Sequence, residues 1–160
     1  MQEGSKGSTF GTVVKTVVVI GAIHAGLVAL GRYMSNKAKE LEQDNEGRKS
    51  KKYMSFMNGK DIRISREEVE EISIRSMMGG VNLDLTEAYI AEDMEIKIQS
   101  VMSGVSIKVP PMVRVRLEGT NIMGGFANMV PNYEKEELPT IRIEADSVMG
   151  GIAVEMVPEA

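Results

Sequence analysis

The chain has 160 residues, of which 42% are hydrophobic, and a formal net charge of −4. These values suit one folded domain with an appendage and argue against a dedicated nucleic-acid-binding protein, which usually carries a basic domain. The absence of cysteine and the presence of a single histidine exclude disulfides, thiol catalysis, cysteine-ligated zinc and multi-histidine metal sites. We therefore expect no cofactor and no nucleic-acid partner.

Charge divides the chain into two parts. Residues 1–52 carry nine basic and five acidic side chains, whereas residues 53–160 carry ten basic and eighteen acidic ones. Such asymmetry indicates that the two parts have different surroundings. Within the first part, the glycine- and serine-rich residues 1–12 predict a flexible tail.

An uncharged apolar stretch follows, from Thr16 to Gly31. Together with its flanking residues it predicts a short membrane-spanning helix over residues 13–33. Neither proline nor glycine interrupts residues 32–46, so we expect one long transmembrane and juxtamembrane helix over residues 13–46. Two other interpretations stay open, a cleaved signal peptide and a helix packed within an assembly.

Basic residues lie mainly after the apolar stretch, with only Lys6 and Lys15 before it. The positive-inside rule then predicts a single-pass membrane protein with residues 1–12 outside and residues 34–160 in the cytoplasm. The basic side chains that follow the stretch are also placed to contact anionic lipid headgroups. They are Arg32, Lys37, Lys39, Arg48, Lys49, Lys51 and Lys52.

A five-residue motif recurs through residues 48–160. It consists of a small polar residue, any residue, methionine, then glycine, serine or asparagine, and finally glycine. The final glycines are 21, 24, 21 and 26 residues apart, and this near-constant spacing predicts a repeat architecture. These glycines are Gly59, Gly80, Gly104, Gly125 and Gly151.

Apolar residues alternate with polar ones on both sides of each motif, which predicts strands with one buried face. The parity of the alternation changes across the glycines, so the chain must bulge or bend there. We expect the five glycines to form structural rung corners, with the positive φ that glycine permits. The whole domain, residues 48–160, is then predicted to be an all-β, β-helix-like solenoid of about five rungs of 21–26 residues.

The methionines of the motif share the parity of the buried positions. We therefore expect them to form an internal core ladder, because methionine at core periodicity usually fills irregular space. A copper-binding methionine array is the functional alternative. The methionines are Met57, Met78, Met102, Met123 and Met149.

Two rungs depart from the pattern. In the first, Lys49, Lys51 and Lys60 take positions that are apolar elsewhere, which predicts a polar cap. In the fourth, Gly119 and Asn128 take inward positions, and the polar residues 132–137 follow it. If the rungs follow chain order, the last rung has an uncovered edge.

Chain order also predicts which charged residues face each other on neighbouring rungs. Glu95 should lie near Arg116 and Lys97 near Glu118, each pair contributing roughly 0–1 kcal/mol.

The run SMMGGVNLDLTEAYIAEDMEIKIQSVMSGVSIKVPPMVRVRLEGTNIMGG resembles the C-terminal domain of the cell wall-active antibiotics response family, LiaF-type proteins. That family shows a GGV strand, an acidic-alanine turn like Glu87-Ala88, a second such strand ending in V-P, and another GG. The resemblance covers about residues 70–158. It implies a β-helix-like domain tethered to a membrane, which regulates an envelope-stress sensor kinase through protein contacts. Family members usually carry several transmembrane helices, whereas one is predicted here. Bactofilins are a looser likeness.

No catalytic constellation accompanies the acidic residues. The candidates among them are Asp84 with Glu87, and the cluster of Glu134, Glu136 and Glu137. We therefore expect that the chain is not an enzyme. The leading hypothesis is a membrane-anchored interaction module that regulates or scaffolds an envelope-associated, stress-sensing complex. The alternative is a self-assembling structural subunit that forms rings or filaments at the membrane. The expected partners are protein, with a sensor kinase implied by the resemblance, membrane lipid, and a second copy of the chain.

Overall fold

The computed structural model describes residues 49–90, 93–133 and 137–158, together with nine helical positions between residues 28 and 43. Most of the predicted helix over residues 13–46 lies outside the described residues, as does the predicted tail, residues 1–12. Within the part that is described, no helix is long and apolar enough to cross a membrane. The transmembrane helix thus stays a prediction.

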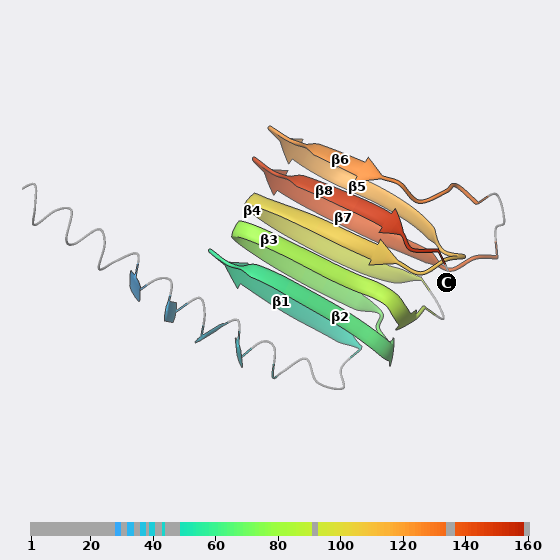
Figure 1. Cartoon of the computed structure of the whole chain (residues 1–160), viewed down its shortest axis with the longest axis horizontal. Helices are drawn as coiled ribbons and strands as arrows, with labels where there is room; N and C mark the ends of the chain where they lie inside the picture. The colour runs from blue at the N-terminus through green and yellow to red at the C-terminus, as the bar shows by residue number, and fades with distance from the viewer. Residues whose placement is uncertain are drawn as a thin grey trace, which may run out of the picture. The chain divides into compact units, whose positions relative to one another are not determined.

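Eight strands build the folded domain, and every pairing between them is parallel. Their layers follow from the pairing. The first halves of the rungs form one layer, in the order β1, β3, β4, β7 and β5, and the second halves form the other (Figure 1). The strands are β1 (Ser50–Phe56), β2 (Gly59–Glu68), β3 (Glu71–Tyr89), β4 (Met94–Val109), β5 (Arg114–Ile122), β6 (Gly125–Asn128), β7 (Thr140–Val148) and β8 (Gly151–Met156).

The all-β solenoid is thereby confirmed. The chain winds through about four turns and builds five rungs, formed by β1–β2, β3, β4, β5–β6 and β7–β8. In two rungs a single strand runs through the bend, because the first half of β3 pairs with β1 and its second half with β2.

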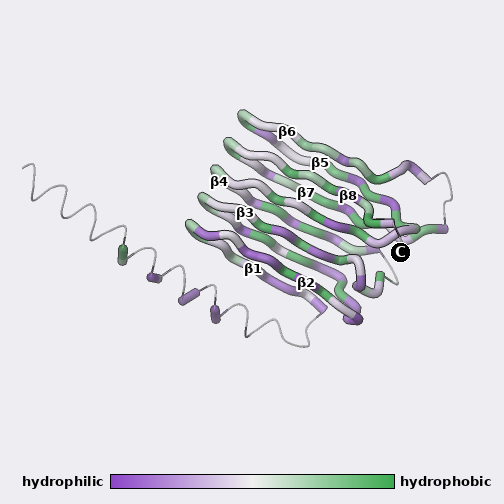
Figure 2. The backbone as a smooth tube through the Cα atoms, viewed as in Figure 1, coloured by the Kyte–Doolittle hydropathy of each residue, from purple (hydrophilic) through white to green (hydrophobic). Residues whose placement is uncertain are grey.

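The core lies between the two layers and consists of the inward residues of the alternating pattern. Figure 2 shows hydrophobic and hydrophilic residues alternating along the strands. Ile96 and Ile143 from the first layer, and Leu83 and Ile107 from the second, have no exposed surface. Full burial of such a side chain contributes roughly 1.5–3 kcal/mol. The period-two pattern therefore favours strands and, through the burial of its inward side chains, also stabilises the stacking of the rungs.

The rungs do not follow chain order. Strands β7 and β8 pair with β4 on one side and with β5 and β6 on the other, so the fifth rung lies between the third and the fourth. Figure 1 shows the red strands between the yellow β4 and the orange β5 and β6. The expectation of an uncovered C-terminal rung was therefore wrong, because the uncovered rung is the fourth.

Sequence features explain this insertion. The inward residues Ile141, Ile143, Ile152 and Val154 are at most 1% exposed and suit a rung that is covered on both sides. The fourth rung has Gly119 at an inward position, which suits a rung at the end of the stack. Residues 129–139 separate β6 from β7 in the sequence, a longer connection than those between the other rungs.

The predicted ion pairs between rungs were also wrong, for the same reason. Glu95 lies beside Arg142 rather than Arg116. Lys97 lies beside Glu144, and its Nζ contacts Glu95 at 3.0 Å and Glu71 of the preceding rung at 3.2 Å. Hydrogen bonds to these two carboxylates, Glu95 first, raise the pKa of the half-buried Lys97 above its ordinary value.

Candidate functional site

The bends join the two layers, and here the repeated motif lies in register across all five rungs. Gly59, Gly80, Gly104, Gly151 and Gly125 are partners of one another along the rungs. The register of the predicted corners is therefore correct.

The positive φ that we predicted for these five glycines is wrong. Positive φ occurs at the methionine of the motif, with φ of 52° to 62° in all five rungs, and at none of the five glycines. No atom lies within 4 Å of a Cβ added at Gly59, Gly104 or Gly125. The close approach is one residue earlier, where a Cβ at Gly150 would lie 2.1 Å from the carbonyl oxygen of Ser103.

The methionine ladder is also on the opposite side from the one predicted. Met57 is 62% exposed, Met102 52% and Met123 75%, and Met78 and Met149 are exposed as well. The left-handed conformation at each methionine ends the alternation, so the parity of the upstream strand does not continue through the bend. The methionines are therefore a surface feature and not a core ladder.

Small polar side chains occupy the inner side of the bend instead. Ser76 Oγ and Ser103 Oγ lie 2.5 Å apart, and Ser100 Oγ donates to Ser147 Oγ at 2.9 Å. All four serines are buried. Because buried hydroxyls need partners, this row of hydrogen bonds explains the small polar residue that begins each motif.

Apolar side chains cover the outer side of the bends and form what we call the corner stripe. It takes the second and third residue of each motif, and the second residues lie in register from rung to rung. Nine of the ten side chains are exposed and Phe56 is half-buried. The stripe consists of Phe56, Met57, Met77, Met78, Val101, Met102, Val148, Met149, Ile122 and Met123.

Stability of the isolated domain does not account for the corner stripe. An L-residue in the left-handed region costs roughly 1–2 kcal/mol, and asparagine or glycine would adopt it more readily. An exposed methionine gains little by burial in return. Contiguous exposed apolar surface instead marks an interaction site, and flexible methionine side chains adapt to varied partners.

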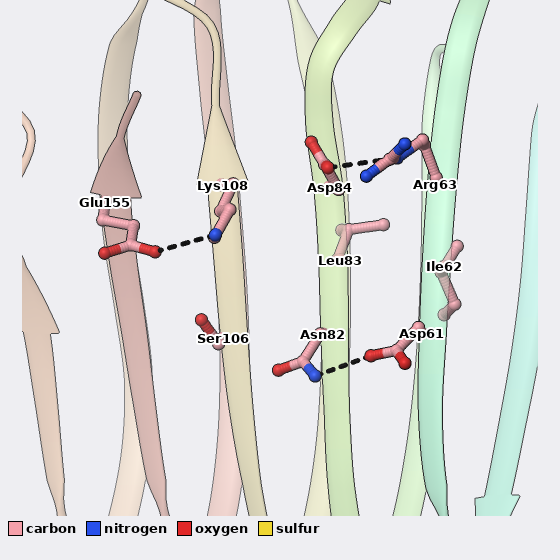
Figure 3. Close-up of a pocket in the computed structure, with 9 residues that line it drawn as sticks. All are labelled: Asp61, Ile62, Arg63, Asn82, Leu83, Asp84, Ser106, Lys108 and Glu155. Atoms are coloured by element: carbon pink, nitrogen blue, oxygen red, sulfur yellow. Dashed lines mark hydrogen bonds and ion pairs between the residues drawn. The ribbon is translucent and has the colours of Figure 1, made fainter. Parts of the chain in front are cut away.

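A second surface feature is a polar groove on the outer face of the second layer (Figure 3). Its charged side chains pair with one another across the rungs. Arg63 Nε contacts Asp84 Oδ2 at 3.2 Å, and Lys108 Nζ lies 3.8 Å from Glu155 Oε1. Asn82 Nδ2 donates to Asp61 Oδ1 at 2.7 Å.

Asp84, a candidate acid from the sequence, is held as a carboxylate. The Thr86 hydroxyl donates to Asp84 Oδ1 at 2.6 Å and is the main reason why the pKa of Asp84 lies below its ordinary value. Burial acts in the opposite direction, and Arg63 lowers the pKa further. The groove thus pairs charges between rungs. Among the described residues, no group of three or more histidine, cysteine or acidic residues is arranged to hold a metal ion.

The predicted lipid-contacting residues are divided by the structure. Lys51 is 6% exposed and pairs with Glu67, so it belongs to the fold and the prediction of headgroup contact was wrong for it. Lys49 is exposed and lies 2.7 Å from Glu70. Arg32, Lys37 and Lys39 are at helical positions, Lys52 is exposed, and Arg48 lies outside the described residues.

Fold and surface together define a class of protein, a parallel β-solenoid domain whose repeated bends present apolar side chains. Within that class, the chain belongs to the family described as cell wall-active antibiotics response LiaF, C-terminal, whose sequence model matches residues 56–154. Membership connects the chain with the cell wall stress response. Family and fold together favour a regulatory or structural role.

Two relatives from Mycobacterium tuberculosis are similar to this chain, the uncharacterized proteins Rv0966c and MT0994. Each is 29% identical over 90 residues, which cover 56% of this chain and 45% of the relative. The chain thus matches less than half the length of these relatives. No solved structure matches it.

Proposed function

We propose that the chain is a membrane-anchored, non-enzymatic interaction module that regulates a complex of the cell envelope in the cell wall stress response. The corner stripe is the observation that carries this proposal. Its ten apolar side chains come from all five rungs, and the five methionines among them hold a left-handed backbone conformation that costs stability in the isolated domain.

The stripe fits an amphipathic helix of a protein partner. Five rungs at the spacing of neighbouring strands give a length of about 19 Å, which corresponds to roughly thirteen residues of α-helix. A helix of that length would lay its apolar face along the methionines, as helices do in other apolar grooves. An envelope-stress sensor kinase is the partner class that the family suggests.

Polar substitution of the stripe tests this role. We expect the triple variant Met78→Asn, Met102→Asn and Met149→Asn to reduce capture of the kinase from native membranes by at least about tenfold, because its apolar contacts are lost. Asparagine tolerates positive φ, so the free energy of unfolding should not decrease. Quantitative mass spectrometry of cross-linked, affinity-purified complexes measures the capture.

Met112 provides the matched control. It is exposed (49%) and has φ of 61°, yet it lies outside the corner stripe. Met112→Asn should therefore capture the same kinase as the unchanged chain. If the triple variant captured it equally well, the stripe would not be the interaction surface.

The proposed location is a single-pass membrane protein with its solenoid in the cytoplasm. The basic residues that follow the apolar stretch support this orientation. Reporter enzymes that are active on only one side of the membrane, fused to either terminus, should show a cytoplasmic C-terminus. An active extracytoplasmic reporter at the C-terminus would contradict the proposal.

A further inference from the structure

The fourth rung exposes one end of the apolar interior. Val115 and Leu117 point toward the core but remain partly exposed, whereas their register partners Ile141 and Ile143 in the neighbouring rung have no exposed surface. Among the described residues, no strand pairs with the outer edge of β5 or β6. Phe126 and Val130 also pack against the core, so the interior is partly covered at this end and Leu117 stays accessible.

The other end of the solenoid is closed by charge. Lys51 occupies the inward position that Ile72 takes in the next rung, and it is buried and paired with Glu67. An inward-pointing charge on an edge strand discourages the addition of another strand. Of the two end rungs of the described domain, the fourth is thus the one suited to edge-to-edge pairing, which would close after two copies and not grow into a filament.

Backbone groups at the centre of β5 point away from the domain. The N–H of Arg114 donates to the carbonyl of Pro139 at 3.0 Å, and the carbonyl of Ile122 accepts from the N–H of Met149 at 2.7 Å. In a parallel ladder alternate residues face the same neighbour, so Leu117 and Gly119 direct their N–H and C=O groups to the free edge. At the same edge, the Val115 carbonyl accepts a hydrogen bond from Asn128 Nδ2 of the same chain at 3.3 Å.

Charges on β5 are mismatched within the chain. Arg116 lies beside Arg142, and Glu118 lies beside Glu144. Like charges on neighbouring strands are destabilising. In an antiparallel pair of two β5 strands centred on Leu117, Arg116 lies opposite Glu118 of the partner subunit, and the symmetry repeats this pair.

We propose that two copies of the chain join edge to edge through β5, antiparallel about a two-fold axis at Leu117. The contact continues the sheet, covers the partly open end of both apolar interiors and gives each of the mismatched side chains an opposite charge. The proposed pairing is centred on Leu117, whereas the corner stripe takes only the last residue of β5, Ile122, so failure of the dimer would leave the proposed kinase contact untouched.

Cysteine cross-linking of the full chain in detergent micelles tests the geometry. The chain has no cysteine of its own, so a single introduced thiol reports one contact. In a hydrogen-bonded antiparallel pair the opposed Cα atoms are about 5.5 Å apart, which permits a disulfide. Leu117→Cys should give mostly covalent dimer on mild oxidation, whereas Tyr53→Cys at the closed end should stay monomeric. No dimer from Leu117→Cys, or equal dimer from both, would overturn the proposal.

Charge exchange supplies a test that leaves the core unchanged. Arg116→Glu or Glu118→Arg should each weaken dimerisation about tenfold, because each creates two like-charge pairs across the axis. The double variant should restore it. At concentrations where the chain is monomeric, Arg116→Glu faces Arg142 and should not lower stability. Sedimentation at a series of concentrations measures the dissociation constant, and equal values for all variants would overturn the proposal.

Discussion

Gly150→Ala is expected to destabilise the domain by about 3 kcal/mol or more, at the upper end of what overpacking costs. A Cβ at Gly150 would lie 2.1 Å from the carbonyl oxygen of Ser103 and 3.2 Å from Ser147 Oγ. Both atoms belong to the crowded inner side of the bend between the third and fifth rungs, where the backbone of each rung is fixed by the ladder on both sides. One methyl group should therefore separate two rungs.

Gly104→Ala is the matched control. Gly104 has neither positive φ nor any atom within 4 Å of an added Cβ, so alanine should change the free energy of unfolding by less than about 1 kcal/mol, and in the stabilising direction. Chemical denaturation of both variants measures the difference. Equal stabilities would mean that the close approach between rungs is absent at Gly150.

The sequence was sufficient to predict the repeat and its register but not which residue bends the chain. Glycine is the usual residue at positive φ, and both glycines of the motif looked suitable. Only the packing of one rung against the next shows that the first of the two glycines lies too close to the carbonyl oxygen of the neighbouring rung to carry a Cβ. The left-handed conformation is instead taken by Met102 and its equivalents. The signal in the sequence was the restriction of that first position to glycine, serine and asparagine.

The order of the rungs could not be predicted from periodicity, because each rung carries the same local pattern and could stack on any other. The inward Gly119 and the long connection over residues 129–139 distinguished the fourth rung. Both features were visible in the sequence as irregularities, but they indicate the end of the stack only once it is known which rung covers each face of the fourth rung. The exposure of the methionines could not be predicted either, because the alternation of the upstream strand, which predicted them to be buried, ends at the bend.

The insertion of the fifth rung has a large expected consequence for truncation. A chain that ends at residue 139 should lose the structure of β5 and β6 together with β7 and β8, because within the described domain β5 and β6 stack only on β7 and β8. Protection of the β5 amide hydrogens against exchange should fall by about three orders of magnitude, toward that of an unfolded segment. In a solenoid stacked in chain order, β5 would instead remain protected on β4.

A shorter chain that ends at residue 113, and so keeps the buried Val113, provides the comparison. It lacks both the fourth and the fifth rung and keeps the first three, β1 to β4. If the fourth rung needs the fifth as its platform, residues 114–139 add no stabilising contacts, and the two truncated chains should unfold at the same denaturant concentration. A higher midpoint for the chain that ends at residue 139, with protected β5 amides, would show that the fourth rung can pack directly on the third. The order of the rungs would then be a preference of the complete chain, selected by the better inward residues Ile141, Ile143, Ile152 and Val154 over those of the fourth rung.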